Sequence, residues 1–120
     1  MFGNDYSTLD GTSVRDYIHV MGIAEGRATA LDFLSENSGW HAINLGARQG
    51  YSVLEVVNAF ERASGQKIPC RIVPRRFGDV AECYANPKKA SALLKWQAKR
   101  TLNDMCLSAW LFQRQLVLDQ

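Results

Sequence analysis

The sequence has few of the residues that identify a metal site, a disulfide-bonded fold or a membrane protein. Its three cysteines, Cys70, Cys83 and Cys106, include no CxxC pair, so neither a zinc site nor a disulfide framework is indicated. No apolar run approaches the roughly 18 residues of a membrane span, and Met1 is not followed by a basic and then an apolar segment. The net charge of +2 is too small for a nucleic-acid-binding surface. We therefore expect a cytoplasmic protein that binds neither nucleic acid nor membrane.

The length and composition predict one folded domain. The chain has 120 residues, 47% of them hydrophobic and 22% charged. A chain of this length buries roughly two thirds of its surface on folding, so it can form a core without metal or disulfide cross-links. We treat residues 1–120 as a single domain and exclude a two-domain enzyme.

Periodicity and turn residues predict an α/β chain with about four helices and short strands. Helices are expected over residues 21–35, 53–63 and 87–95 and from Thr101 onward, where apolar residues recur at steps of three and four. Ser52 and Glu55 have capping-box spacing, and Asn86 with Pro87 is typical of a helix start.

Residues 1–15 are rich in turn formers and are predicted to be a loop. Three β-prone stretches, 17–20, 40–45 and 68–73, are predicted to be strands. Three short strands are too few for a complete doubly wound sheet, so the fold is expected to be partial.

Motifs for redox chemistry are weak or missing. Gly46 and Gly50 give only GxxxG, so a turn is favoured over a dinucleotide site. Tyr84 and Lys88 have the spacing of a dehydrogenase pair, but Pro87 between them disfavours a shared helix face. His19 and His41 have no metal-ligand spacing and are predicted to be structural. We therefore assign no catalytic, cofactor-binding or metal-binding residue.

Arginines at loop and strand edges are the remaining candidates. Arg15, Arg75 and Arg76 lie near Asp16 or Asp79, and a guanidinium suits the oxygen pair of a phosphate. Ordinary surface ion pairs would give the same pattern. Composition alone favours the ion pairs.

Longer motifs resemble the C-terminal third of the UDP-glucose 4-epimerase family, within the extended short-chain dehydrogenases. The resemblance covers nearly the whole chain. Its most specific part is Asp10-Gly-Thr-Ser-Val-Arg-Asp-Tyr-Ile-His-Val20. The other matching segments are Phe2-Gly-Asn-Asp-Tyr6, Asn44-Leu-Gly46, Ser52-Val-Leu-Glu-Val-Val-Asn-Ala-Phe60, Pro74-Arg-Arg-Phe-Gly-Asp79 and Ala85-Asn-Pro87.

The resemblance implies a UDP-sugar site without the redox machinery. In the family an N-terminal Rossmann domain holds NAD and the Ser/Tyr/Lys group, while the C-terminal region binds UDP-glucose or UDP-galactose. Arg15 and Arg76 would contact the diphosphate, Asp79 the ribose hydroxyls and Cys83 the hexose, and Tyr17 is a further substrate-binding residue. A fragment of this kind, with a role in galactose metabolism, is expected to be inactive as an epimerase on its own.

The chain also departs from the family. Gly22 and Arg27 replace the usual Asp and His of the first helix, and Cys83 stands where many epimerases have a tyrosine. Either the smaller side chain leaves room beside the hexose for a 2-acetamido group, or Cys83 is simply a small buried residue. Two other functions stay open: a structural or interaction module, and part of a nucleotide-sugar dehydratase or decarboxylase. We expect a homo-oligomer, because Leu31 and Leu34, with Ile23, Ile43 and Leu45, would lack cover.

Overall fold

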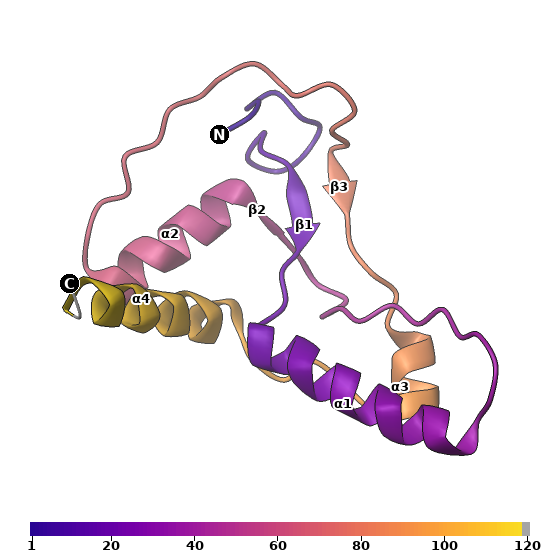
Figure 1. Ribbon diagram of the computed structural model, residues 1–120. Coiled ribbons are helices and arrows are strands. Elements are labelled where there is room, and N and C mark those ends of the chain that lie inside the picture. The colour runs from indigo at the N-terminus through magenta and orange to yellow at the C-terminus, as the bar shows by residue number, and fades with distance from the viewer. Residues whose placement is uncertain (119–120) are drawn as a thin grey trace.

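The computed structural model describes residues 1–118, over which four helices and a three-stranded sheet are formed (Figure 1). This confirms the predicted partial α/β fold. No helix in this part of the chain is long and apolar enough to cross a membrane. The elements in chain order are β1 (Val14–Asp16), α1 (Val20–Glu36), β2 (Gly50–Ser52), α2 (Val53–Ser64), β3 (Glu82–Cys83), α3 (Lys88–Leu94) and α4 (Leu102–Leu118).

Strand β1 is the centre of the sheet, with β2 antiparallel on one side and β3 parallel on the other. The predicted strands were wrong: 17–20, 40–45 and 68–73 form no strand, although Val73 makes an isolated parallel bridge with Phe2. β-prone residues form a strand only where a partner strand lies beside them. The first two residues of β1, Val14 and Arg15, lie in the segment 1–15 that was predicted to be a loop. The strand was missed because three residues are too few to show a period of two.

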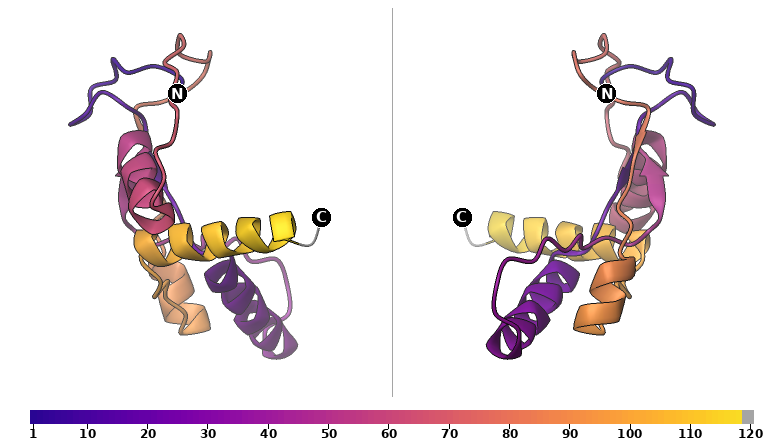
Figure 2. Two further views of the ribbon diagram at one scale, coloured as in Figure 1. Left: turned by 90° about the vertical axis from the view of Figure 1, so that its left-hand side faces the viewer. Right: turned by 90° about the vertical axis from the view of Figure 1, so that its right-hand side faces the viewer.

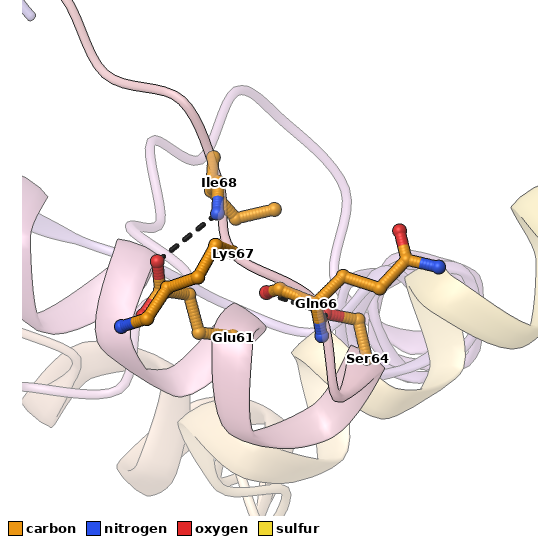
Figure 3. Close-up of polar contacts among 5 residues, drawn as sticks. All are labelled: Glu61, Ser64, Gln66, Lys67 and Ile68. Atoms are coloured by element: carbon orange, nitrogen blue, oxygen red, sulfur yellow. Dashed lines mark hydrogen bonds and ion pairs between the residues drawn. The ribbon is translucent and has the colours of Figure 1, made fainter.

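Helix α2 begins and ends where the sequence predicts. The Ser52 hydroxyl accepts from the Glu55 amide at 3.0 Å, and the Glu55 carboxylate accepts from the Ser52 amide at 2.7 Å. Gly65 ends the helix with φ of 69°. Beyond it, the Ile68 amide donates to Glu61 at 3.0 Å, which ties the departing chain back to α2 (Figure 3).

The N-terminal loop is fastened to the start of α2 by Asp10. Its carboxylate accepts from the Thr12 hydroxyl at 2.7 Å and from the Ser52 hydroxyl. The Thr12 oxygen in turn accepts from the Leu54 amide at 3.3 Å. Desolvation opposes ionisation of Asp10, but the hydrogen bonds from Ser52 and Thr12 prevail and lower its pKa. The Asp-Gly-Thr segment is therefore structural.

Two small clusters form the core. Between α2 and α4, Ala59, Leu102 and Cys106 are buried, with Phe60 and Met105 packed around them. The second cluster, described below, joins α1 to α3.

Helix α1 confirms the predicted helix, but its buried residues are glycines and not large apolar residues. Gly22 and Gly26 are its buried residues, and together with Ala30 and Phe33 they define the glycine face. A Cβ at position 26 would lie 2.9 Å from Leu45 and 3.1 Å from Trp96. Only glycine lets the helix backbone approach these side chains so closely.

Two large apolar residues of α1 outside the glycine face are open to solvent. Leu31 and Leu34 are exposed, as predicted. Ile43 and Leu45 are not left uncovered, contrary to the prediction, because they pack against the cluster of Ala90, Leu94 and Trp96. The chain itself therefore covers the glycine face of α1 and leaves Leu31 and Leu34 uncovered.

The last two helices begin within one residue of their predicted starts, but the N-cap of α3 is Pro87 and not the predicted Asn86. The Asn86 side chain accepts from the Lys88 amide at 3.2 Å, with Pro87 between them at the helix boundary. At the start of α4, the Asp104 carboxylate accepts from the Thr101 amide at 2.7 Å, and the Asp104 amide donates to the Thr101 hydroxyl at 3.2 Å. The start of α4 was thus correctly predicted, whereas that of α3 was predicted one residue too early.

Candidate functional site

The sheet brings Arg15 and Cys83 together. They are paired across the parallel strands β1 and β3, so their side chains leave the same face of the sheet. Asp16 points to the other face, where its carboxylate accepts from the amides of Ala47 at 2.9 Å and Ala85 at 3.1 Å. Asp16 is therefore a structural residue, whereas Arg15 is partly exposed and its guanidinium donates to the Val14 carbonyl at 2.7 Å.

A tight turn brings Arg76 beside Asp79. The Asp79 amide donates to the Arg76 carbonyl at 3.2 Å, and Gly78 in the third position has φ of +85°. A positive φ in this position is that of a type II turn, which favours glycine. The Arg76 guanidinium then contacts the Asp79 carboxylate at 3.1 Å.

Asp79 also contacts Arg15, so one carboxylate lies between two guanidinium groups. The second distance is 3.6 Å. The side chains of Asp79 and Arg15 are 20% and 28% exposed, whereas that of Arg76 is 62% exposed. We call Arg15, Arg76 and Asp79 the arginine cluster. It carries one net positive charge on an accessible surface, where an anion can reach it.

Phe2 belongs to the same surface, although sequence reasoning did not select it as a site residue. The Arg76 guanidinium carbon lies 4.4 Å from the centre of the Phe2 ring. The bridge between Phe2 and Val73 brings this ring to the arginine cluster. The matching Phe2-Gly-Asn-Asp-Tyr6 motif was the feature of the sequence that could have pointed to Phe2 as a site residue.

The neighbouring Arg75 serves the fold instead. It contacts Asp5 at 2.7 Å and lies 4.2 Å above the Tyr6 ring. The hydrogen bond from Arg75 lowers the pKa of Asp5. Two consecutive arginines thus have different partners, one in the N-terminal loop and one in the cluster.

The remaining predicted residues lie apart from the cluster or have structural roles. Tyr17 follows β1, but no hydrogen bond joins it to the arginine cluster within residues 1–118. The His19 ring accepts from the Met21 amide at 3.1 Å and so caps α1, as expected for a structural histidine. Tyr84 lies before the start of α3 at Lys88, so these two do not share a helix face. No group of three metal-ligating side chains is assembled within the described part of the chain.

Comparison with known proteins gives the family. The family model described as GDP-mannose 4,6 dehydratase matches residues 1–108, so the chain belongs to that family. Within it, the chain is 53% identical to UDP-glucose 4-epimerase from Bacillus subtilis over 113 residues and 54% identical to the Homo sapiens enzyme over 115 residues. These matches confirm the resemblance to UDP-glucose 4-epimerases. The chain spans 33% of the length of either relative.

Solved epimerase structures have the same fold. The match to UDP-glucose 4-epimerase from Stenotrophomonas maltophila, with bound NAD and formylated UDP-arabinopyranose, has a TM-score of 0.94 and 46% identity. It covers 99% of this chain and 35% of that one. The Bifidobacterium longum enzyme, in complex with NAD+ and UDP, matches with a TM-score of 0.90 and 47% identity, covering 95% of this chain and 34% of that one.

Proposed function

We propose that this chain binds the UDP part of a UDP-hexose through the arginine cluster. Arg15 and Arg76 hold the diphosphate, and Asp79 accepts from the ribose hydroxyls. Cys83, next to Arg15 in the sheet, lies beside the hexose together with Tyr17. The observation that supports this proposal most is that Asp79 lies within 3.1 and 3.6 Å of two guanidinium groups.

The chemistry of the cluster suits such a ligand. A diphosphate offers oxygen pairs to both guanidinium groups, and charge-assisted hydrogen bonds are about twice as strong as neutral ones. The Asp79 carboxylate is an acceptor that suits a diol. When UDP binds, the two arginines thus lose their contact with Asp79 and gain several contacts with phosphate oxygens. The Asp79 carboxylate then accepts hydrogen bonds from the ribose hydroxyls instead.

The same proposal covers the activity of this chain. We propose that the 120 residues alone neither bind NAD nor interconvert UDP-glucose and UDP-galactose, because the sequence has no glycine-rich phosphate loop and its Tyr84 and Lys88 do not share a helix. A cytoplasmic role in galactose metabolism and self-association through exposed apolar residues are further parts of the proposal. Detectable turnover by the purified chain would contradict it.

Calorimetric titration with UDP, UDP-glucose and dTDP-glucose tests the binding site. Arg15→Ala and Arg76→Ala should each weaken UDP binding by about 1.5 to 3 kcal/mol, which is typical for a hydrogen bond to a charged group. Arg71→Ala is the matched control, because Arg71 is an exposed arginine on the same segment. Its UDP affinity should equal that of the unmodified chain.

Asp79→Ala gives a sharper test, because it should change two affinities in opposite directions. UDP binding should weaken, since the ribose loses its acceptor, whereas inorganic pyrophosphate should bind more tightly to the two freed arginines. If both affinities stay unchanged, the cluster is a surface ion-pair network. Absence of binding by all three nucleotides would favour an interaction module, and preference for dTDP-glucose would favour a dehydratase.

A further inference from the structure

Helix α4 extends away from the rest of the chain. Figure 2 shows its C-terminal end far from the other elements. Its first half packs on α2 through the buried Leu102 and Cys106, whereas all residues from Leu111 to Leu118 are exposed. The chain as a whole exposes 8545 Å², about 2,000 Å² more than a compact monomer of 13.4 kDa. The second half of α4 is part of this uncovered surface.

One exposed face of α4 has the residue spacing of a coiled-coil seam, with alternating steps of three and four. Its leucines at positions 107, 111 and 118 are 42%, 52% and 75% exposed, and its two charged residues are exposed as well. The face flanks the side that packs on α2, because Arg114 and Leu118 border the same cavity as Trp110, which contacts α2. We call this face the α4 seam, formed by Asp104, Leu107, Leu111, Arg114 and Leu118.

The two charged residues of the α4 seam form no ion pair within residues 1–118. The Asp104 carboxylate accepts from the amide and the hydroxyl of Thr101 at 2.7 and 2.8 Å, both through Oδ2. These hydrogen bonds lower the pKa of Asp104, so its carboxylate is ionised at neutral pH. Oδ1 of Asp104 and the guanidinium of Arg114 can therefore each take an opposite charge from a partner.

Antiparallel pairing of two seams supplies these opposite charges. About a two-fold axis level with Ala109, each residue faces the residue equally far along the helix on the other side of that position. Asp104 then faces Arg114 of the second copy, and Leu107 faces Leu111, so that each contact occurs twice. A parallel pair would instead place like charges against each other, and a shift by one heptad would place Arg114 against Leu111. The charges thus favour one orientation and one register.

We propose that a second copy of this chain docks on the α4 seam, so that two α4 helices form an antiparallel pair. Because each α4 points away from the rest of its own chain, the two remaining bodies lie at opposite ends of the pair (Figure 2). The family model matches residues 1–108, so Leu111, Arg114 and Leu118 lie beyond it. The dimer rests on the self-association proposed above and assigns it to particular residues. It does not require UDP binding, because the arginine cluster lies outside α4.

The paired surface is small. Helix α4 has 17 residues and is therefore about 25 Å long, and a helix is about 10 Å wide. Such a contact is below the size of a standard interface, which buries roughly 800 Å² per partner. We therefore expect a monomer–dimer equilibrium with a dissociation constant in the micromolar range.

Sedimentation equilibrium of the 120-residue chain, at concentrations up to about 1 mM, measures this dissociation constant. Leu111→Asp should weaken dimerisation about tenfold or more, because each dimer contains the altered contact twice. Leu116→Asp is the matched control, since Leu116 is 44% exposed on the same helix but lies outside the α4 seam. It should leave the dissociation constant unchanged.

A charge exchange tests the orientation and the register. Arg114→Glu and Asp104→Arg should each abolish dimerisation of the variant alone, because like charges then face each other. A mixture of the two variants should dimerise, because every contact between positions 104 and 114 again joins opposite charges. Circular dichroism checks that both variants are folded, since Asp104→Arg also removes a helix cap.

Three results would overturn the α4 dimer. The first is an unmodified chain that stays monomeric at about 1 mM, and the second is a mixture of the two folded charge variants that does not associate. The third is a dimer that Leu31→Asp dissociates and Leu111→Asp does not, since α1 would then be the contact. UDP titration of the same variants keeps the two proposals separate, because UDP affinity should be the same in all of them.

Discussion

Helix α2 contains its own start and stop signals, whereas α1 depends on residues far away in the sequence. The capping box of Ser52 and Glu55 and the left-handed Gly65 fix the ends of α2 within 14 residues. In α1, Gly26 lies against Leu45 and Trp96, which come from other segments. The ends of α2 are therefore set by neighbouring residues, although its buried face still packs on α4, whereas the buried face of α1 is set entirely by distant segments.

The largest loss of stability should come from adding a methyl group on the glycine face of α1. Gly26→Ala places a methyl group 2.9 Å from Leu45 and should destabilise the fold by about 1 to 3 kcal/mol, as overpacking does. At position 22 the nearest atom is 3.6 Å away. Gly22→Ala should therefore be neutral or stabilising by up to about 1 kcal/mol, through better helix propensity. Urea denaturation of both variants measures the difference, and equal effects would contradict the close packing.

The second largest loss of stability should come from removing Asp10, which fastens the N-terminal loop to α2. Asp10→Ala leaves the buried hydroxyls of Thr12 and Ser52 without their acceptor, and a loss of about 2 kcal/mol in unfolding free energy is expected. Replacing Asp5, whose partner is the exposed Arg75, should cost less. If the two variants lose equal stability, the Asp10 network is no stronger than a surface pair.

The same network gives a pH dependence of defined sign. Hydrogen bonds lower the pKa of Asp10 below its ordinary value of 3.8 in the folded chain. Its contribution is therefore fully present above pH 3.8 and is lost as the pH falls through the lower folded value. Stability measured from pH 6 downward should fall more steeply for the unmodified chain than for Asp10→Asn. Parallel curves would show that Asp10 is not the titrating group.

The smallest expected effect is a gain in unfolding free energy. The Trp96 ring nitrogen is buried and has no acceptor within residues 1–118, and a Cβ at position 22 would lie 4.0 Å from the adjacent ring carbon Cζ2. Gly22→Asp, which restores the usual family residue, should stabilise the fold by about 1 kcal/mol. In a Trp96→Phe background the gain should disappear, and its persistence would assign the effect to the helix dipole instead.

Local signals explain which elements could be predicted. All four helices were located because their caps lie within a few residues of their ends. The strands could not be, since β1, β2 and β3 have only two or three residues each and depend on partners distant in sequence. The buried face of α1 was also missed, because glycine carries no hydrophobic signal.

The site was predictable only in part for the same reason. Arg76 and Asp79 are near in sequence, but Arg15 reaches them through the pairing of β1 with β3. Spacing alone could not distinguish a ligand site from ion pairs, and the motif resemblance selected these residues. Phe2 was missed because an aromatic residue in a loop has no periodic pattern that reveals its neighbour.

The excess surface has a calorimetric consequence. The heat capacity change of unfolding reflects newly hydrated area, and a compact chain of this length would give about 1.6 kcal/mol/K. The folded chain exposes 8545 Å², about 2,000 Å² more than a compact monomer of 13.4 kDa, and this already hydrated area lowers the heat capacity change by roughly 15%. The stability curve of the chain is therefore flatter with temperature than that of a compact chain of the same length.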